Sequence, residues 1–230
     1  MKVLKELTET LKRNPQQTAF WMLGALLLVF MLAASWDAGI SFDEAKEYAY
    51  ANDVLDHYLG ESKEESWDAN KPLYGQMKYY GSSFNLLAAA VNRVSPKNPY
   101  ETKHLLNALF GFLAILFAAL LAKNTGGWKA AIITIVLLGL SPRFFGHSLN
   151  NAKDIPFATG YLVSLFYMGK YLENPVSPKW KHLVGLTVGI ALAISIRAGG
   201  LLLYLVLGLM VVIYGIQNRG GFSKNFPKIA

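Results

Sequence analysis

Five charged residues stand where apolar runs of the sequence end, and their types suit transfer chemistry. They are Asp43, Glu44, Lys153, Asp154 and Arg197. A carboxylate can take a proton from an incoming hydroxyl group. Lysine and arginine can hold a phosphate, arginine in bidentate fashion. If the chain brings these residues to one membrane face, they predict a site where a hydroxyl group meets a lipid phosphate.

The acidic pair in ISFDEAKEYA, residues 40–49, also has a purely structural interpretation. Ser41 followed three residues later by Glu44 fits a capping box at the start of a helix. Asp43 and Glu44 would then both favour the positive end of the helix dipole. The two interpretations are compatible, because a cap can fix a helix whose first turn presents a catalytic acid.

The composition is that of a polytopic membrane protein. Of the 230 residues, 53% are hydrophobic and only 16% are charged, and there is no cysteine. The absence of cysteine excludes disulfides and thiolate metal sites. The net charge of +7 is spread over the short gaps between apolar runs, so it does not predict a nucleic-acid surface.

The apolar runs predict an all-α fold with about six transmembrane helices, because each span needs about 20 mostly apolar residues. Arg197 and the two glycines that follow divide the last long run into two spans. The expected spans are 14–36, 104–122, 128–146, 155–172, 182–198 and 201–217.

The basic residues predict a cytoplasmic N-terminus. Twelve of them fall in segments on the same side as the N-terminus, against three in the short connections on the other side. This is the bias of the positive-inside rule. The segments with the twelve basic residues are 1–13, 123–129, 170–181 and 218–230.

The first outer loop, 37–103, is expected to carry two amphipathic surface helices, at 42–59 and 79–94. Apolar residues recur at three- and four-residue steps in both stretches. Glu47 falls among the residues assigned to the polar side of the first helix. The expected apolar stripes are Tyr48, Ala51, Leu55, Tyr58 and Leu59 in the first, and Tyr80, Phe84, Leu87, Val91 and Val94 in the second.

Four stretches in this order resemble the GT-C membrane glycosyltransferases that use a polyprenyl-phosphate-linked sugar. That superfamily includes the protein O-mannosyltransferases and the aminoarabinose transferases of lipid A. The resemblance covers residues 15–217. The stretches are FDEAKEYAYANDVL (42–55), YYGSSFNLLAAAV (79–91), LGLSPRFFGHSLNNAKDIPF (138–157) and GLTVGIALAISIRAGGLLL (185–203).

The resemblance implies roles for the five charged residues. Asp43 matches the catalytic acid that activates the acceptor hydroxyl, and Glu44 matches its acidic neighbour. Asp154 matches an aspartate that organises the site. Arg197 stands where relatives often have lysine and is expected to bind the donor phosphate, with Lys153 as a second candidate. Some relatives need a divalent cation, which Asp43 and Asp154 could hold through oxygen ligands.

The resemblance implies an integral protein of a bacterial inner membrane, with a polyprenyl-phosphate sugar donor and a lipid, glycan or protein acceptor. Residues 1–217 are expected to form the transferase module and 218–230 a cytoplasmic loop or truncated end. Resembling proteins have further spans, so we expect this chain to be a piece of such an enzyme. A non-catalytic membrane anchor or assembly protein is the alternative. A transporter is less favoured, because the spans are nearly free of acidic residues.

Overall fold

The computed structural model describes residues 14–61, 77–94, 98–175 and 177–217, and these residues form helices and connections without any β-strand. The expected all-α class is therefore confirmed for the described part of the chain. The stretch 60–78, which connects the two expected surface helices, falls mostly outside the described residues, and the segment 218–230 falls wholly outside them.

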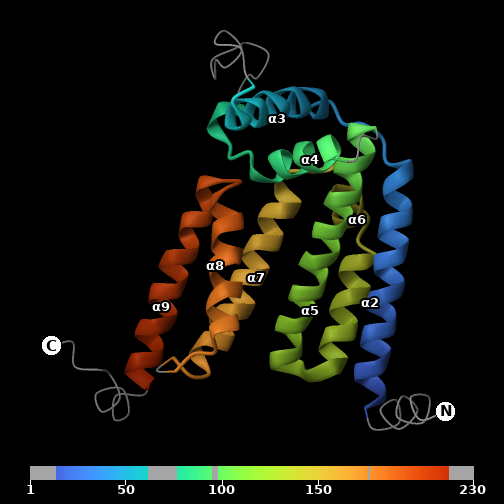
Figure 1. Cartoon of the computed structure of the whole chain (residues 1–230). Helices are drawn as coiled ribbons and strands as arrows, with labels where there is room; N and C mark the ends of the chain where they lie inside the picture. The colour runs from blue at the N-terminus through green and yellow to red at the C-terminus, as the bar shows by residue number, and fades with distance from the viewer. Residues whose placement is uncertain (1–13, 62–76, 95–97, 176, 218–230) are drawn as a thin grey trace, which may run out of the picture.

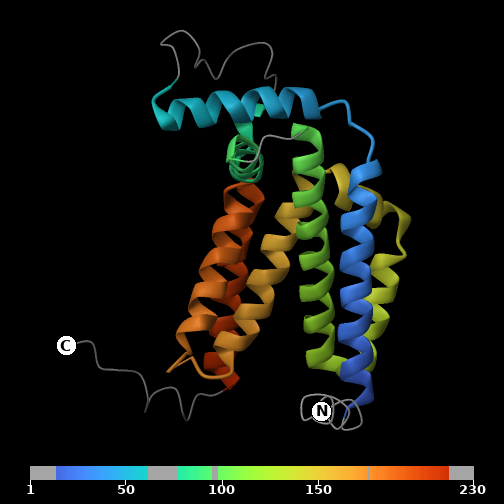
Figure 2. The same cartoon turned by 45° about the vertical axis from the view of Figure 1, so that its right-hand side comes forward.

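Upright helices stand side by side, and two helices lie across one end of them (Figures 1 and 2). We call this end the covered end. The crossing helices are α3 (Glu44–Leu59) and α4 (Ser83–Val94), with α4 between α3 and the upright helices. The upright helices are α2 (Pro15–Ala34), α5 (Pro99–Gly139), α7 (Asp154–Leu172), α8 (Trp180–Ile194) and α9 (Leu202–Gln217), and the short α6 (Pro142–Asn150) follows α5.

Three helical segments of the described chain are long and apolar enough to cross a membrane. They are Pro15–Asp37, Pro99–Gly139 and Ala198–Gln217, and α8 is apolar but shorter. The segments expected at 14–36 and 201–217 agree with the first and last of these. The expected total of six spans stays a prediction.

The segment expected at 128–146 is not one continuous helix in the structure, so its predicted extent is wrong. The chain turns at Gly127, which has φ 68°, and a second arm of α5 runs back beside α2 as far as Gly139. Glycine adopts this left-handed backbone without strain. The second arm ends because Pro142 follows: Ser141 is extended, with φ −68° and ψ 111°, as residues before proline prefer. Pro142 then begins α6.

Helices α7 and α8 approach each other closely through small residues. A Cβ atom on Gly160 would lie 2.8 Å from the backbone nitrogen of Ala193, and one on Gly189 would lie 2.7 Å from the backbone nitrogen of Ser164. The absence of side chains lets the two backbones approach, as small residues do between membrane helices. This contact fixes the end of α8, and therefore Arg197 just beyond it, against α7.

The crossing helices bury different faces from those expected. In α3 the predicted Ala51 and Leu55 are buried, but Tyr58 is 75% exposed. In α4 the predicted Phe84 is buried, but Val94 is 88% exposed. The other buried residues of α4 are Asn85, Ala88 and Ala89, and not the predicted Leu87, Val91 and Val94.

Candidate active site at the covered end

Glu44 begins α3 and is completely buried. Its Oε2 accepts a hydrogen bond from the Ser41 N–H at 2.5 Å, and its Oε1 lies 2.8 Å from Nε2 of His104 at the start of α5. Half of the expected capping box is therefore present, although Asp43, not Ser41, is the residue that precedes the helix. Burial would raise the pKa of Glu44, but the hydrogen bonds to His104 and Ser41 and the electrostatic attraction of His104 and Lys103 hold its pKa below the ordinary value.

Glu47, one turn further along α3, is also buried and joins two lysines. One carboxylate oxygen pairs with Lys103 of α5, and the other lies 3.0 Å from Nζ of Lys153. The assignment of Glu47 to the polar, solvated side of α3 is therefore wrong. Two cations compensate the cost of burying this carboxylate.

Lys153 and Arg197 meet at the ring of Tyr80. Nζ of Lys153 lies 5.2 Å from the ring centroid, and Cζ of Arg197 lies 5.4 Å from it. Lys153 immediately precedes α7, and Arg197 lies in the extended break between α8 and the following 3-10 turn, Ala198–Leu201. The structure thus brings together the two residues expected to hold a phosphate.

Asp154 is tied to the same cluster through Arg197. Its Oδ1 lies 2.8 Å from an Arg197 nitrogen, and its Oδ2 accepts a hydrogen bond from the Asn151 amide at 2.9 Å. The Asn151 amide also lies 3.0 Å from Nδ1 of His147. Arg197 nevertheless keeps its buried Nε without a hydrogen-bond acceptor among the described residues. We call Glu47, Tyr80, Lys153, Asp154 and Arg197 the charged cluster.

Asp43 differs from the other predicted acids. It is exposed, and its carboxylate caps no backbone N–H of α3. The next residue, Glu44, is buried and fixes the backbone beside Asp43. An exposed carboxylate on a fixed helix end can accept a proton from a hydroxyl group that approaches from outside the protein.

Sequence reasoning missed four residues of this region: Glu47, Tyr80, Lys103 and His104. The sequence did hold a signal for the last two, because Lys103 and His104 are polar residues at the very start of an apolar run. Their burial, with 5% and 2% of their surface exposed, requires acidic partners, and α3 supplies them.

Among the described residues, no three histidine or acidic side chains are placed to share a metal ion. The two residues expected to hold a divalent cation were Asp43 and Asp154, and the Asp154 carboxylate is already engaged by Arg197 and Asn151. A divalent cation bound by Asp43 and Asp154 stays a prediction.

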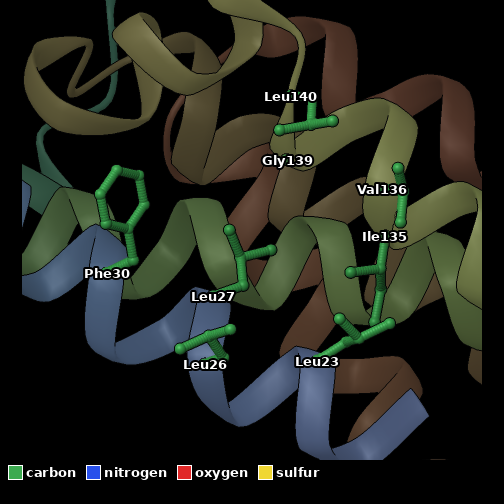
Figure 3. A pocket seen from close by; sticks show the side chains of 8 residues that line it. All are labelled: Leu23, Leu26, Leu27, Phe30, Ile135, Val136, Gly139 and Leu140. Atoms are coloured by element: carbon green, nitrogen blue, oxygen red, sulfur yellow. The ribbon is translucent and has the colours of Figure 1, made fainter. Parts of the chain in front are cut away.

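A groove of about 440 Å³ lies elsewhere, between α2 and the second arm of α5 (Figure 3). Hydrocarbon side chains, together with Gly139, form its walls, so it offers contacts to apolar chains but no group that could hold a phosphate or react. Its lining residues are Leu23, Leu26, Leu27, Phe30, Ile135, Val136, Gly139 and Leu140.

Long apolar helices with a cluster of charged side chains gathered at one end define an integral membrane protein with a polar site at the end of its helices. Comparison with known protein families then shows which family of membrane proteins the chain belongs to. Residues 84–230, more than half of the chain, match the dolichyl-phosphate-mannose-protein mannosyltransferase family, and the chain belongs to this family. The expected GT-C type is thereby confirmed, and the protein is a membrane glycosyltransferase of the mannosyltransferase type. No curated protein and no solved structure matches the chain.

Proposed function

We propose that this protein transfers a sugar from a polyprenyl-phosphate donor to an acceptor hydroxyl group, and that the charged cluster binds the donor phosphate. The observation that carries the proposal is the meeting of Lys153 and Arg197 at Tyr80, at the covered end of apolar helices. With the covered end at the membrane surface, the phosphate of a lipid would lie level with the charged cluster and its hydrocarbon chain beside the apolar helices. The family membership supports the same class of donor.

In the proposed reaction the acceptor oxygen attacks the anomeric carbon of the sugar. The bond between that carbon and the phosphate oxygen breaks, and polyprenyl phosphate leaves with the electron pair. Asp43 takes the hydroxyl proton as the new glycosidic bond forms. Arg197 and Lys153 stabilise the negative charge on the departing phosphate. This single displacement inverts the configuration at the anomeric carbon.

The acids at the site divide into different roles in this proposal. Asp154 holds Arg197 through its 2.8 Å ion pair, so it organises the phosphate-binding side chains. Glu44 is inaccessible, with none of its surface exposed, so it positions the start of α3 instead of touching the substrate. Asp43, which is exposed and precedes Glu44 in the chain, is the carboxylate that meets the acceptor hydroxyl group.

The proposed orientation places the covered end at the outer face of a bacterial inner membrane. The starting end of α2 and the final end of α9 then lie on the cytoplasmic side, because both are at the opposite end of the bundle (Figure 1). We propose that the upright segments supply six crossings, with the two arms of α5 counted separately. The basic residues of 123–129 and 170–181 support this orientation.

The donor class is tested with membranes that contain the full-length gene product. Radiolabelled polyprenyl-phosphate mannose and polyprenyl-phosphate glucose are supplied separately, with nucleotide sugars as the comparison. Release of polyprenyl phosphate from a lipid-linked donor is expected, and membranes without the protein provide the background. Consumption of nucleotide sugars alone, with lipid-linked donors untouched, would contradict the proposal.

A further inference from the structure

The ring of Tyr80 lies near two cations that come from different parts of the chain. Lys153 and Arg197 approach the ring to 5.2 and 5.4 Å, and each carries a full positive charge. Two like charges that approach the same ring repel each other, more strongly near a protein than in bulk water. An aromatic face attracts both, since its quadrupole favours a cation above the ring.

The backbone beside Tyr80 is fixed directly to the backbone beside Arg197. The Gly81 N–H donates a hydrogen bond to the Ile196 carbonyl oxygen at 3.0 Å. A Cβ atom on Gly81 would overlap the Ser195 carbonyl, so no other residue fits there without displacing the chain. The ring of Tyr80 is thereby held beside Arg197.

Two serines add to this attachment. The Ser83 hydroxyl donates to the Ser195 carbonyl oxygen at 3.2 Å, and the Ser195 hydroxyl lies 2.8 Å from Oγ of Ser83. These contacts join the start of α4 to the end of α8, across 112 residues of sequence. The stretch YGSS (80–83) therefore acts as one anchored unit.

Both cations retain hydrogen-bonding capacity although each has a carboxylate partner. Glu47 pairs with Lys153 and Asp154 with Arg197. An ammonium group has three donors and a guanidinium five, and the Lys153 and Arg197 side chains keep 18% and 35% of their surface exposed. An anion can therefore bind to the pair while both ion pairs stay formed.

We propose that Tyr80 is a positioning residue that holds Lys153 and Arg197 together as one binding unit for a lipid-linked phosphate monoester or diester. Without the ring, the two side chains separate and the anion loses simultaneous contact with both. The inference rests on the proposed function only in taking this anion to be the phosphate of the sugar donor.

The test uses the full chain in lipid nanodiscs and measures the Kd of farnesyl phosphate, with uncharged farnesol as the comparison for the hydrocarbon tail. Tyr80→Leu is expected to weaken farnesyl phosphate binding about tenfold and to leave farnesol binding unchanged. Tyr80→Phe keeps the ring and is expected to bind as the wild type does. Tyr79→Leu, which removes the adjacent and exposed tyrosine, is the matched control.

Two further variants separate positioning from loss of fold. Fluorinated phenylalanine at position 80 keeps the shape of the ring but reduces its attraction for cations, so affinity is expected to fall as fluorine atoms are added. In a Lys153→Met, Arg197→Met background, Tyr80→Leu is expected to have little further effect. Wild-type affinity in Tyr80→Leu, or no response to fluorination, would overturn the proposal.

The outcomes also distinguish this inference from the proposed function. If farnesyl phosphate binding depends on Tyr80 but no lipid-linked sugar is consumed, the inference stands and the proposed reaction fails. If sugar is transferred and both the KM for the donor and the Kd are unchanged in Tyr80→Leu, the reaction stands and the inference fails. The inference predicts a raised KM for the donor together with a lowered kcat, because the same two cations stabilise the departing phosphate.

Discussion

Oε1 of Glu47 lies 3.0 Å from Nζ of Lys153, and the other carboxylate oxygen of Glu47 pairs with Lys103. One buried side chain of α3 therefore connects the beginning of α5 with the beginning of α7. The crossing helix is joined to these two upright helices through charge, whereas its apolar residues pack mainly against α4. This connection fixes α3, which begins directly after Asp43, to the charged cluster.

Replacement of Glu47 by glutamine tests that connection. Glu47→Gln keeps the shape but leaves Lys103, which is almost completely buried, without its nearest carboxylate, so we expect a loss of about 3 kcal/mol in the free energy of unfolding. Thermal unfolding in detergent measures it. Glu61→Gln is the matched control: its pair with Arg93 is about half exposed, and the expected loss is under about 1 kcal/mol. Equal losses in both variants would contradict the account.

Replacement of Gly81 by alanine tests the attachment of the YGSS stretch. The added methyl group would overlap the Ser195 carbonyl, so the stretch has to move away from Arg197. We expect a loss of about 1–3 kcal/mol in stability and reduced donor turnover. Gly39→Ala is the control, because a Cβ atom there meets nothing within 4 Å. Wild-type stability and turnover in Gly81→Ala would show that the close contact is not needed.

The lowered pKa of Glu44 predicts acid sensitivity at the start of α3. A carboxyl group with a depressed pKa in the folded state stabilises the fold fully above its ordinary value of 4.5, and this contribution is lost as the pH falls through the lower, folded value. We expect α3 to become accessible to protease as the pH falls below about 4.5. Glu44→Gln is expected to remove this part of the pH dependence. An unchanged acid profile in that variant would assign the sensitivity to other groups.

The chain contains no cysteine, so single introduced cysteines can report its orientation without further engineering. Tyr58 is exposed near the end of α3, and Ser177 is exposed between α7 and α8 at the other end of the bundle. With the proposed orientation, Tyr58→Cys reacts with a membrane-impermeant maleimide in intact spheroplasts. Ser177→Cys reacts only after permeabilisation. Reaction of both in intact spheroplasts would contradict the crossings proposed for α7 and α8.

The helices were largely predictable because long apolar runs leave few alternatives. Asp154–Leu172 begins within one residue of the expected 155–172. The break after Gly139 was also visible in principle, since Pro142 restricts the residue before it. The prediction of one helix over 128–146 failed because it followed hydropathy and gave the proline too little weight.

The charged cluster was predictable only in part. Lys153, Asp154 and Arg197 stand out because they interrupt apolar sequence. Glu47 did not stand out, because a helical polarity pattern assigns every acid to the solvated face. Its burial depends on Lys103 and Lys153, which lie far away in the sequence, and no local pattern contains such a pairing. Tyr80 was assigned to an apolar stripe, and its contact with two cations appears only in the folded chain.

The most direct test of the central claim is donor turnover by Asp43→Asn, in membranes that contain the full-length gene product at matched protein levels. Asp37→Asn, which alters another exposed acid six residues earlier in the chain, is the control. Loss of a general base predicts that release of polyprenyl phosphate falls about a hundredfold or more in Asp43→Asn and is unchanged in Asp37→Asn. Wild-type turnover in Asp43→Asn would contradict the assignment of Asp43 as the residue that activates the acceptor.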